Sequence, residues 1–461
     1  MSRPFNRQLN KVFCLVLAAV FFAAPAFAIT VREVKSPGGI TAYLAEDHTT
    51  PIIAITFGFK GGSAIDPDAK LGLSGMVTSL LDEGAGTLDS FAFQTELQDR
   101  AITLRFGADS DYVTGNLVTT TPNAPKAYEL LRLAMTQPRF DQEPVERIRR
   151  QILVGIQSRL ENPGRIAGQR LMEEMFGKHP YAREDDGSPE TIKGITTDDL
   201  RGWVKSRLAR DRLLVSASGD ITPAQLARTL DQLFGALPAT TGLNAEVPPA
   251  PVIGTGKIIR INKNLPQSMI YIGQKGLLRK DPDWYKAQVV DYVFGGGSFA
   301  SRLMDEVREK RGLAYSVGTG LAPYSAGAMM MASVGTRADQ ADASLKVIQD
   351  EWRKMRDGGP TQEELDDAKQ YLTGAWPLRF TSTSSIADIL LAVQRDKLGL
   401  DYIDKRNDLI NAVTLEQAQA FSKQLYDADN LVVVIMGPDP SLAKPAPGAK
   451  PAAKPAAKAK P

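Results

Sequence analysis

The chain has 461 residues, of which 43% are hydrophobic and 23% are charged, which is enough for two domains with sizeable cores. Its only cysteine, Cys14, lies in an apolar N-terminal run, so the remainder has no disulfide and no thiol chemistry. The formal net charge is +2, with three basic residues in 1–28 and five in 440–461. Without these eight charges the rest carries −6, which argues against nucleic-acid binding.

The N-terminus has the pattern of a secretory signal peptide. Basic residues at positions 3, 7 and 11 precede an apolar run over 12–22 and the small-residue sequence Ala26-Phe27-Ala28. The run is too short for a structural membrane span, and the residues before Cys14 do not form a lipoprotein cleavage pattern. We therefore expect residues 1–28 to be removed on secretion. The mature chain would then have no membrane span and no lipid anchor, and would reside in a bacterial periplasm.

Periodic apolar residues predict alternating groups of strands and helices in the first half of the chain. Alternating or continuous apolar residues indicate strands, over 40–44, 52–59, 102–106, 112–119 and 213–218. Helical spacing indicates helices, over 71–81, 91–100, 125–135, 144–160, 165–176 and 197–208. A further helix begins at Thr222, with Pro223 in its first turn.

The second half of the chain repeats this pattern. The segment 195–219 recurs without gaps as 413–437. Each copy begins with a threonine followed three residues later by an acid or amide, a helix-capping pair, and ends in a buried strand. The pairs are Thr196 with Asp199 and Thr414 with Gln417. The duplication predicts an α+β fold of two homologous domains, each an antiparallel sheet with helices packed on one face.

Composition places the domain boundaries. A Pro-, Ala- and Gly-rich linker over 239–256 separates an N-terminal domain over 29–238 from a C-terminal domain over 257–439. Residues 440–461 contain mostly Lys, Pro and Ala, which predicts a disordered tail. The tail is either a solvated spacer or a weak electrostatic contact with an anionic surface.

A glycine-rich stretch in the C-terminal domain is the most distinctive motif. Its residues are Gly295, Gly296, Gly297 and Ser298. A short charged helix follows and stops at Gly312, where a left-handed residue is favoured, before a strand over 313–317. Arg308 lies near the end of that helix and Tyr315 on the strand, so a tight turn would point both side chains at one place.

This stretch resembles the C-terminal half of the pitrilysin-type (insulinase, M16) metallopeptidases, and more closely the half-length subunits related to mitochondrial processing peptidase. The family pattern R-L-x-x-x-V-R-x-K-x-G-L-x-Y matches residues 302–315. The resemblance implies that Arg308 and Tyr315 bind the substrate backbone and polarise the scissile carbonyl. It also implies that the Gly-rich loop, Gly295, Gly296, Gly297 and Ser298, belongs to the substrate-binding site. It covers nearly the whole mature chain and implies the same two-domain duplication.

The family's zinc motif, H-x-x-E-H, is replaced in this chain. In that motif two histidines one helical turn apart hold zinc, a glutamate between them acts as general base, and a later glutamate completes the site. The matching ligand positions here are Gly75, Ser79 and Gly155, and the base position is Thr78. Glycine has no donor atom, and a neutral hydroxyl is a poor ligand and a poor base.

The two histidines of the chain do not compensate for this loss. His48 lies in a turn between strands, where we expect it to face solvent. His179 lies in the sequence His-Pro-Tyr, where we expect a packing or capping role. A hydrolytic zinc site normally needs three protein ligands. We therefore expect no metal and no cofactor in this chain, and zinc in a partner subunit.

Two classes of function fit these observations. In the first, the chain is a non-catalytic subunit of a heterodimeric zinc peptidase, and its Arg308 and Tyr315 serve a partner that carries H-x-x-E-H and cleaves extended peptides. In the second, it is a binding or scaffold protein without a proteolytic role. A hydrolase using Ser79 or Ser298 is disfavoured because neither serine has a paired base. Arg308 also has a purely structural alternative, a surface ion pair with Asp305 or Glu309.

Overall fold

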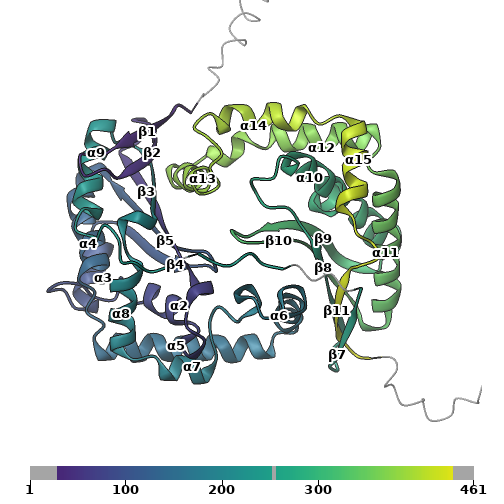
Figure 1. Cartoon of the computed structure of the whole chain (residues 1–461), viewed down its shortest axis with the longest axis horizontal. Coiled ribbons are helices and arrows are strands. Elements are labelled where there is room, and N and C mark those ends of the chain that lie inside the picture. The colour runs from purple at the N-terminus through teal and green to yellow at the C-terminus, as the bar shows by residue number, and fades with distance from the viewer. Residues whose placement is uncertain (1–28, 245, 252–255, 440–461) are drawn as a thin grey trace, which may run out of the picture.

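The computed structural model describes residues 29–244, 246–251 and 256–439. The expected signal peptide over 1–28 and the expected tail over 440–461 lie outside the described residues. Two α+β domains face each other across the molecule, which confirms the predicted fold class (Figure 1). Within the described ranges, no helix combines the length and apolar character that a membrane crossing requires.

The first domain is built on a six-stranded sheet with the order β1-β2-β6-β3-β5-β4. Its strands are β1 (Val31–Lys35), β2 (Thr41–Glu46), β3 (Ile52–Lys60), β4 (Thr103–Ala108), β5 (Tyr112–Thr120) and β6 (Leu213–Gly219). The second domain has a five-stranded sheet with the order β7-β11-β8-β10-β9. Its strands are β7 (Ile258–Asn262), β8 (Gln267–Lys275), β9 (Ala314–Pro323), β10 (Ala328–Arg337) and β11 (Val432–Gly437).

The two sheets have the same topology once the extra edge strand β1 is set aside. In each sheet the last strand, β6 or β11, inserts between the first two equivalent strands. Because those two strands run in opposite directions, the inserted strand must be parallel to one of them. The sheets are therefore antiparallel except at the pairs β2–β6 and β7–β11, which corrects the expectation of purely antiparallel sheets.

The helices follow the same duplicated order. Those of the first domain are α2 (Leu73–Thr78), α3 (Ser90–Asp99), α4 (Ala124–Thr136), α5 (Gln142–Glu161), α6 (Pro163–Phe176), α7 (Pro189–Gly194), α8 (Thr197–Arg207) and α9 (Pro223–Phe234). Those of the second are α10 (Trp284–Asp291), α11 (Ala341–Gly358), α12 (Gln362–Gly374), α13 (Thr383–Arg395), α14 (Tyr402–Asn411) and α15 (Leu415–Leu425). Thr196 and Thr414 form the predicted capping boxes at the starts of α8 and α15.

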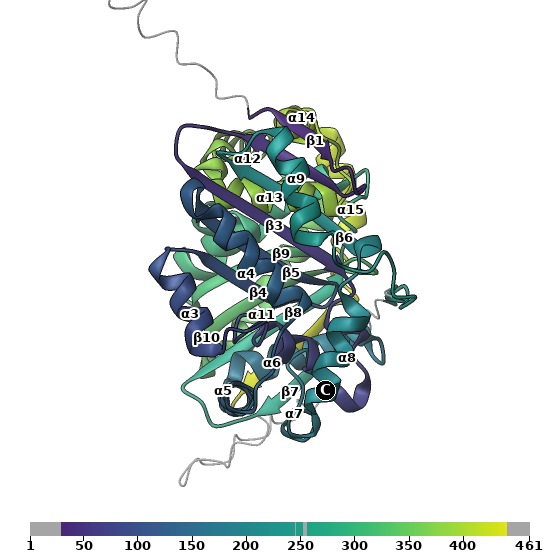
Figure 2. The ribbon, with the colours of Figure 1, turned by 90° about the vertical axis from the view of Figure 1, so that its left-hand side faces the viewer.

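One helix of each domain packs on the sheet of the other domain. Helix α13 of the second domain packs on β2, β3 and β6 of the first, and α6 of the first packs on β8 and β11 of the second. Figure 2 shows α4 and α9 in front of the first sheet, and α13 covers the opposite face. The fold therefore has a helix layer on both faces of each sheet, which corrects the expectation of helices on one face; the second layer comes from the other domain.

The alternation of side chains along the strands shows this exchange. On β3, Ile55 and Phe57 join the core of the first domain, whereas the hydroxyl of Thr56 on the opposite face donates to Asp388 of α13 at 2.9 Å. On β11, Val433 packs in the core of the second domain and Val434 in the cluster around α6. The two cores are thus interlocked through both sheets.

The turn between β9 and β10 docks onto the first domain and joins the domains a second time. The hydroxyl of Tyr181 donates to Asp111 at 2.6 Å and accepts from the backbone N–H of Ala326 at 3.0 Å. Asp111 also accepts from the N–H of Ser325 at 2.8 Å. The Tyr181 ring lies 4.7 Å from that of Tyr324. Because these bonds cross the domain boundary, they fix the orientation of the second sheet relative to the first.

A buried ion pair holds the start of α2, the helix that carries the replaced zinc motif. Asp66 and Arg207 lie 3.0 Å apart, with side-chain exposures of 0% and 6%. Asp66 also accepts from the N–H and the hydroxyl of Ser74 in the first turn of α2. Trp203 donates to the same hydroxyl at 3.0 Å. The position of α2 therefore depends on a polar network that is sealed from water.

Replacing Arg207 should destabilise the fold strongly. In Arg207→Met the carboxylate of Asp66 loses its cation while it stays buried, and such losses cost about 3–5 kcal/mol. The free energy of unfolding from urea titrations measures this effect. The control is Asp350→Asn, which breaks exposed pairs with Lys346 and Arg353 and should cost no more than about 1 kcal/mol. Equal effects in the two variants would show that the buried pair does not hold the fold.

Candidate functional site

Helix α2 and its C-cap residue Ser79 carry three of the four positions that hold the zinc machinery in the resembled family. Gly75 is partly exposed, and a Cβ built there would meet no atom within 4 Å. Ser79 is exposed and its hydroxyl donates to the carbonyl of Gly75 at 2.9 Å. Thr78 is buried, and its hydroxyl donates to the carbonyls of Ser74 and Gly75. Both hydroxyls are thus bonded within the helix, and neither has a base beside it.

The fourth position, Gly155, lies in the middle of α5 and lines a cavity of about 370 Å³. A Cβ at Gly155 would also meet no atom within 4 Å. The backbone at Gly75 and Gly155 would therefore accept a Cβ without a clash, although the sequence supplies none. No group of three metal-ligating side chains occurs among the described residues.

The two histidines lie in structural positions. Nδ1 of His179 accepts from the N–H of Tyr181 at 3.2 Å, and its Nε2 lies 2.8 Å from the carbonyl of Pro248 in the linker. His48 is about half exposed and pairs with Glu46 and Asp220. These carboxylates, Asp220 first, raise the pKa of His48. The expected capping role of His179 and the expected surface position of His48 agree with this arrangement.

The structure brings Arg308 and Tyr315 together, as the sequence predicts. A π-helical segment, Met304–Glu309, carries Arg308, and the chain turns at Gly312 with φ of +60° into β9. The guanidinium of Arg308 lies 5.1 Å from the centroid of the Tyr315 ring. The guanidinium also forms an ion pair with Glu309 at 3.4 Å, which is the surface ion pair named above as the structural alternative for Arg308. Tyr315 is 80% exposed, however, and is not a core residue.

Sequence reasoning missed a third member of this group, Phe299. Its ring is 66% exposed and lies 4.8 Å from the guanidinium of Arg308. Arg308 therefore lies close to two exposed aromatic rings, and both contacts favour the cation and restrict its side chain. The available signal was a large apolar residue directly after a glycine-rich loop. Arg308, Tyr315 and Phe299 are called the clamp below.

The glycines shape the loop that carries Phe299. A Cβ at Gly295 would lie 2.6 Å from the hydroxyl of Thr319, and one at Gly297 would lie 2.6 Å from the carbonyl of Tyr292. Ser298 has a φ of +52°, in the left-handed region. Gly295 thus lets a second π-helical turn, Tyr292–Gly296, pack tightly on β9, and Gly297 lets the chain pass close to Tyr292 at the end of that turn. This loop places Phe299 beside Arg308.

A buried carboxyl group lies against the same π-helical turn. Asp291 is 8% exposed and accepts a hydrogen bond from the hydroxyl of Thr319 at 2.6 Å. Burial raises the pKa of Asp291 to about 6, and the bond from Thr319 opposes this shift. A Cβ at Gly296 would lie 2.8 Å from its carboxylate, so the loop closes over this group.

The comparisons with known proteins agree with this geometry. The family model "Insulinase (Peptidase family M16)" matches residues 41–185, and the model "Peptidase M16 inactive domain" matches residues 194–372. Together they cover more than half of the chain.

The chain belongs to the M16 peptidase family.

Two relatives of this M16 chain bear names that deny peptidase activity, whereas another, from Bacillus subtilis, is called an "uncharacterized zinc protease". A "non-peptidase homolog" from Helicobacter pylori is 26% identical over 93% of this chain and 98% of its own. A "probable inactive metalloprotease" from Bacillus subtilis is 24% identical over 74% of this chain and 83% of its own. The crystal structure of a "peptidase M16 inactive domain" from Pseudomonas fluorescens has a TM-score of 0.83 and 29% identity, and covers 89% of this chain and 98% of its own.

The buried carboxyl of Asp291 predicts a pH-dependent stability. An ordinary aspartate has a pKa of 3.8, so the unfolded chain loses this proton before the folded M16 chain does. The free energy of unfolding therefore falls as the pH rises from about 4 through 6, by about 2–3 kcal/mol for a shift of roughly two units. Urea titrations of the natural chain and of Asp291→Asn at pH 4 and pH 7 isolate this contribution. The variant should gain about that much relative to the natural chain at pH 7, and parallel pH profiles would contradict the prediction.

Restoring the missing ligands should restore metal binding. The open space at Gly75 and Gly155 predicts that the combined variant Gly75→His, Ser79→His, Gly155→Glu binds about one Zn²⁺ per chain. Metal analysis after dialysis and calorimetric titration measure the stoichiometry and the affinity. The control is the same variant without Gly155→Glu, which should bind zinc more weakly. Absence of stoichiometric zinc in the full variant would mean that these positions do not converge.

Proposed function

We propose that this chain is a non-catalytic, substrate-binding subunit of a heterodimeric periplasmic zinc metallopeptidase. In this proposal a partner of the same family carries H-x-x-E-H and the zinc ion, and this chain supplies Arg308 and Tyr315 to the partner's active site. The observation that carries it is the presence in one M16 chain of an ordered clamp and of zinc positions without ligands. A chain that hydrolysed peptides alone would need both parts, whereas a pair of subunits can divide them.

The names of the relatives support the first half of the proposal. The Helicobacter pylori relative is called a non-peptidase homolog and the Bacillus subtilis relative a probable inactive metalloprotease. The replaced positions Gly75, Ser79 and Gly155 give this chain the same expected inactivity when it is alone. Zinc in the partner would supply the Lewis acid and the activated water of the reaction.

The chemistry of the clamp supports the second half. A guanidinium offers five hydrogen-bond donors and a permanent positive charge, and a phenol hydroxyl offers one more donor. Both groups can stabilise a peptide carbonyl oxygen that gains negative charge during hydrolysis. The π-helical turn, Gly312 and the ring of Phe299 hold Arg308 near Tyr315 before any substrate arrives. Such preorganisation means that less side-chain entropy is lost on binding.

The location of Tyr315 favours extended peptides as substrates. Tyr315 lies on β9, which pairs only with β10 among the described strands and so forms an edge of its sheet. An exposed edge offers backbone donors and acceptors to an added strand. A peptide that lies along this edge would present its carbonyl groups near the clamp.

The test is peptide hydrolysis by the purified mature chain, by an H-x-x-E-H partner from the same organism, and by their mixture. Activity should appear only in the mixture, with about one zinc ion per pair. Arg308→Ala should lower kcat/KM of the mixture by about 10²–10³, the usual cost of losing one such donor. The control Arg311→Ala removes a nearby exposed cation that pairs with Glu306, and should leave kcat/KM unchanged. Equal activity of the Arg308 variant and the natural chain would remove the clamp role.

A further inference from the structure

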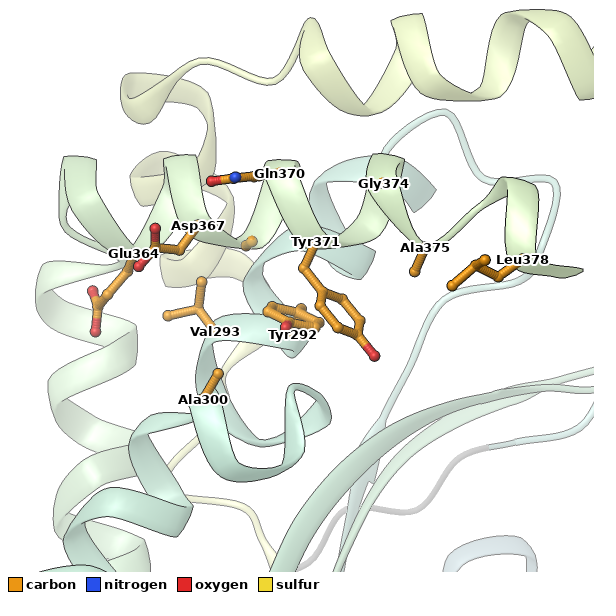
Figure 3. A pocket seen from close by; sticks show the side chains of 11 residues that line it. Tyr292, Val293, Ala300, Glu364, Asp367, Gln370, Tyr371, Gly374, Ala375 and Leu378 are labelled. Carbon is orange, nitrogen blue, oxygen red and sulfur yellow. The ribbon is translucent and has the colours of Figure 1, made fainter. Parts of the chain in front are cut away.

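Two cavities of the described chain differ in location and in charge. The first, of about 620 Å³, lies between the Gly-rich loop and α12, where the rings of Tyr292 and Tyr371 stack 5.0 Å apart (Figure 3). It adjoins the clamp through the short helix Ser298–Ala300 and belongs to the site already described. The second, of about 750 Å³, has a basic lining and lies where the two domains meet. We call it the boundary cavity.

Segments from both domains line the boundary cavity. The first domain contributes the end of β3, the start of β5 and residues 211–214 before and in β6. The second contributes the loop 278–280 after β8, the turn between β9 and β10, and residues 394–397 at the end of α13. The volume is in the range of small-molecule pockets, about 300–1,000 Å³. A ligand in this cavity would therefore contact both domains at once.

The lining of the boundary cavity has an excess of positive charge. Its six cationic side chains are Lys60, Arg212, Arg279, Lys280, Arg395 and Lys397. Its three carboxylates are Asp211, Glu246 and Asp396. Six cations against three carboxylates leave a net charge of +3, although residues 29–439 together carry −6. A cationic cavity in an otherwise acidic chain attracts anions to that one place.

The excess charge is carried by groups that the protein leaves unpaired. Each carboxylate already has a cationic partner at 2.5–3.5 Å, in the pairs Lys60 with Glu246, Arg395 with Asp396 and Arg212 with Asp211. Arg279, Lys280 and Lys397 have no ion pair within the described ranges. These three cations are therefore available to a ligand.

The protein also fixes two arginines at the cavity wall. The guanidinium of Arg279 lies 4.8 Å from the centroid of the Trp284 ring and donates to the hydroxyl of Tyr402 at 2.9 Å. Arg212 is only 9% exposed, and its Nη1 makes no hydrogen bond with any described residue. A buried cation with an unused donor is unfavourable for the folded chain. An anion held in the adjoining cavity would offset part of this cost.

We propose that the boundary cavity binds a small anion with two phosphate groups, and that this ligand links the two domains. A phosphate ester carries about 1.5–2 negative charges at pH 7, so two such groups match a net charge of +3. Guanidinium groups bind phosphate through two parallel hydrogen bonds, and lysines add compact charges. Carboxylates carry one charge each, so an acidic peptide would have to place three of them in the same cavity.

This proposal goes beyond the proposed function and does not depend on it. None of the cavity residues belongs to the clamp or to the replaced zinc positions. The ligand would act on the stability of the domain boundary, whether or not the chain takes part in peptide hydrolysis.

The experiment is a calorimetric titration of the purified mature chain with pyrophosphate at pH 7. Pyrophosphate should bind about five- to thirtyfold more tightly than inorganic phosphate, because its second group engages further cations. The affinity should fall in 0.3 M salt because the ions screen these charges. Pyrophosphate should also raise the midpoint of thermal unfolding, since it binds only the folded chain. Absence of pyrophosphate binding would overturn the proposal.

Matched variants locate the binding. The double variant Lys280→Gln, Lys397→Gln should weaken pyrophosphate binding about five- to thirtyfold and keep the fold, because both side chains are exposed. The double variant with arginine at both positions should keep the affinity. The control Lys178→Gln, Lys193→Gln removes two exposed lysines that do not line the cavity, and should leave the affinity unchanged.

The five lysines of 440–461 are present in every variant, so a difference between variants reports on the cavity. Equal affinities in the glutamine variant of Lys280 and Lys397 and in the natural chain would overturn the proposal. So would equal losses in that variant and in the control.

Two further probes identify the ligand class. Adenosine diphosphate carries the same two groups on an organic body. Binding as tight as that of pyrophosphate, with the same dependence on Lys280 and Lys397, would support an esterified diphosphate, and weaker binding would support the inorganic ion. A short peptide with three consecutive aspartates represents the other class. If this peptide binds more tightly than pyrophosphate and depends on the same lysines, the assignment to phosphate is overturned.

Discussion

The structure depends on one geometric constraint, namely that each sheet has two faces to cover and each domain supplies helices for only one. The second face of each sheet is covered by α6 or α13 of the other domain. Strand β11 shows the consequence, since Val433 and Val434 point into different cores. Removing either domain would expose one sheet face of the other, and on the first sheet this would leave the hydroxyls of Thr56 and Ser216 without their partners on α13. The two domains therefore stabilise each other and form one cooperative unit, although sequence and topology mark them as two.

This rigidity determines what the chain can contribute to chemistry. The zinc positions and the clamp lie in different domains, and both are held by buried groups, Asp66 below α2 and Asp291 below the Gly-rich loop. The backbone framework at both places is therefore maintained in a chain whose Gly75 and Gly155 have no side chain that could bind a metal. Maintenance of the framework without the ligands is what division of labour between two subunits would require.

Local sequence signals predicted much of this fold and part of the site. The capping boxes at Thr196 and Thr414 revealed the duplication because capping depends on residues three positions apart. The convergence of Arg308 and Tyr315 was predictable for the same reason, since one turn at Gly312 joins them. The parallel pairs β2–β6 and β7–β11 were not predictable, because side-chain alternation does not encode which strands become neighbours.

The stacking of Tyr292 on Tyr371 could not be predicted either, because the two residues are far apart in the chain and local patterns do not show which distant residues meet. Phe299 was missed because a large apolar residue is normally expected in a core. Its exposure goes with the left-handed backbone of Ser298, and the pattern of apolar residues in the sequence does not predict that conformation.

The exchange of α6 and α13 also has a consequence for the order in which the protein is made. The hydroxyl of Thr56 finds its partner Asp388 only after 332 further residues have been added. During synthesis from the N-terminus, one face of the first sheet stays uncovered until α13 has been made, when only α14, α15 and β11 of the second domain are still to come. Contacts between such distant residues slow folding, and an uncovered sheet is prone to aggregate during the delay. The exchange of helices that holds the two domains together in the folded protein thus leaves the nascent chain exposed to aggregation until α13 has been synthesised.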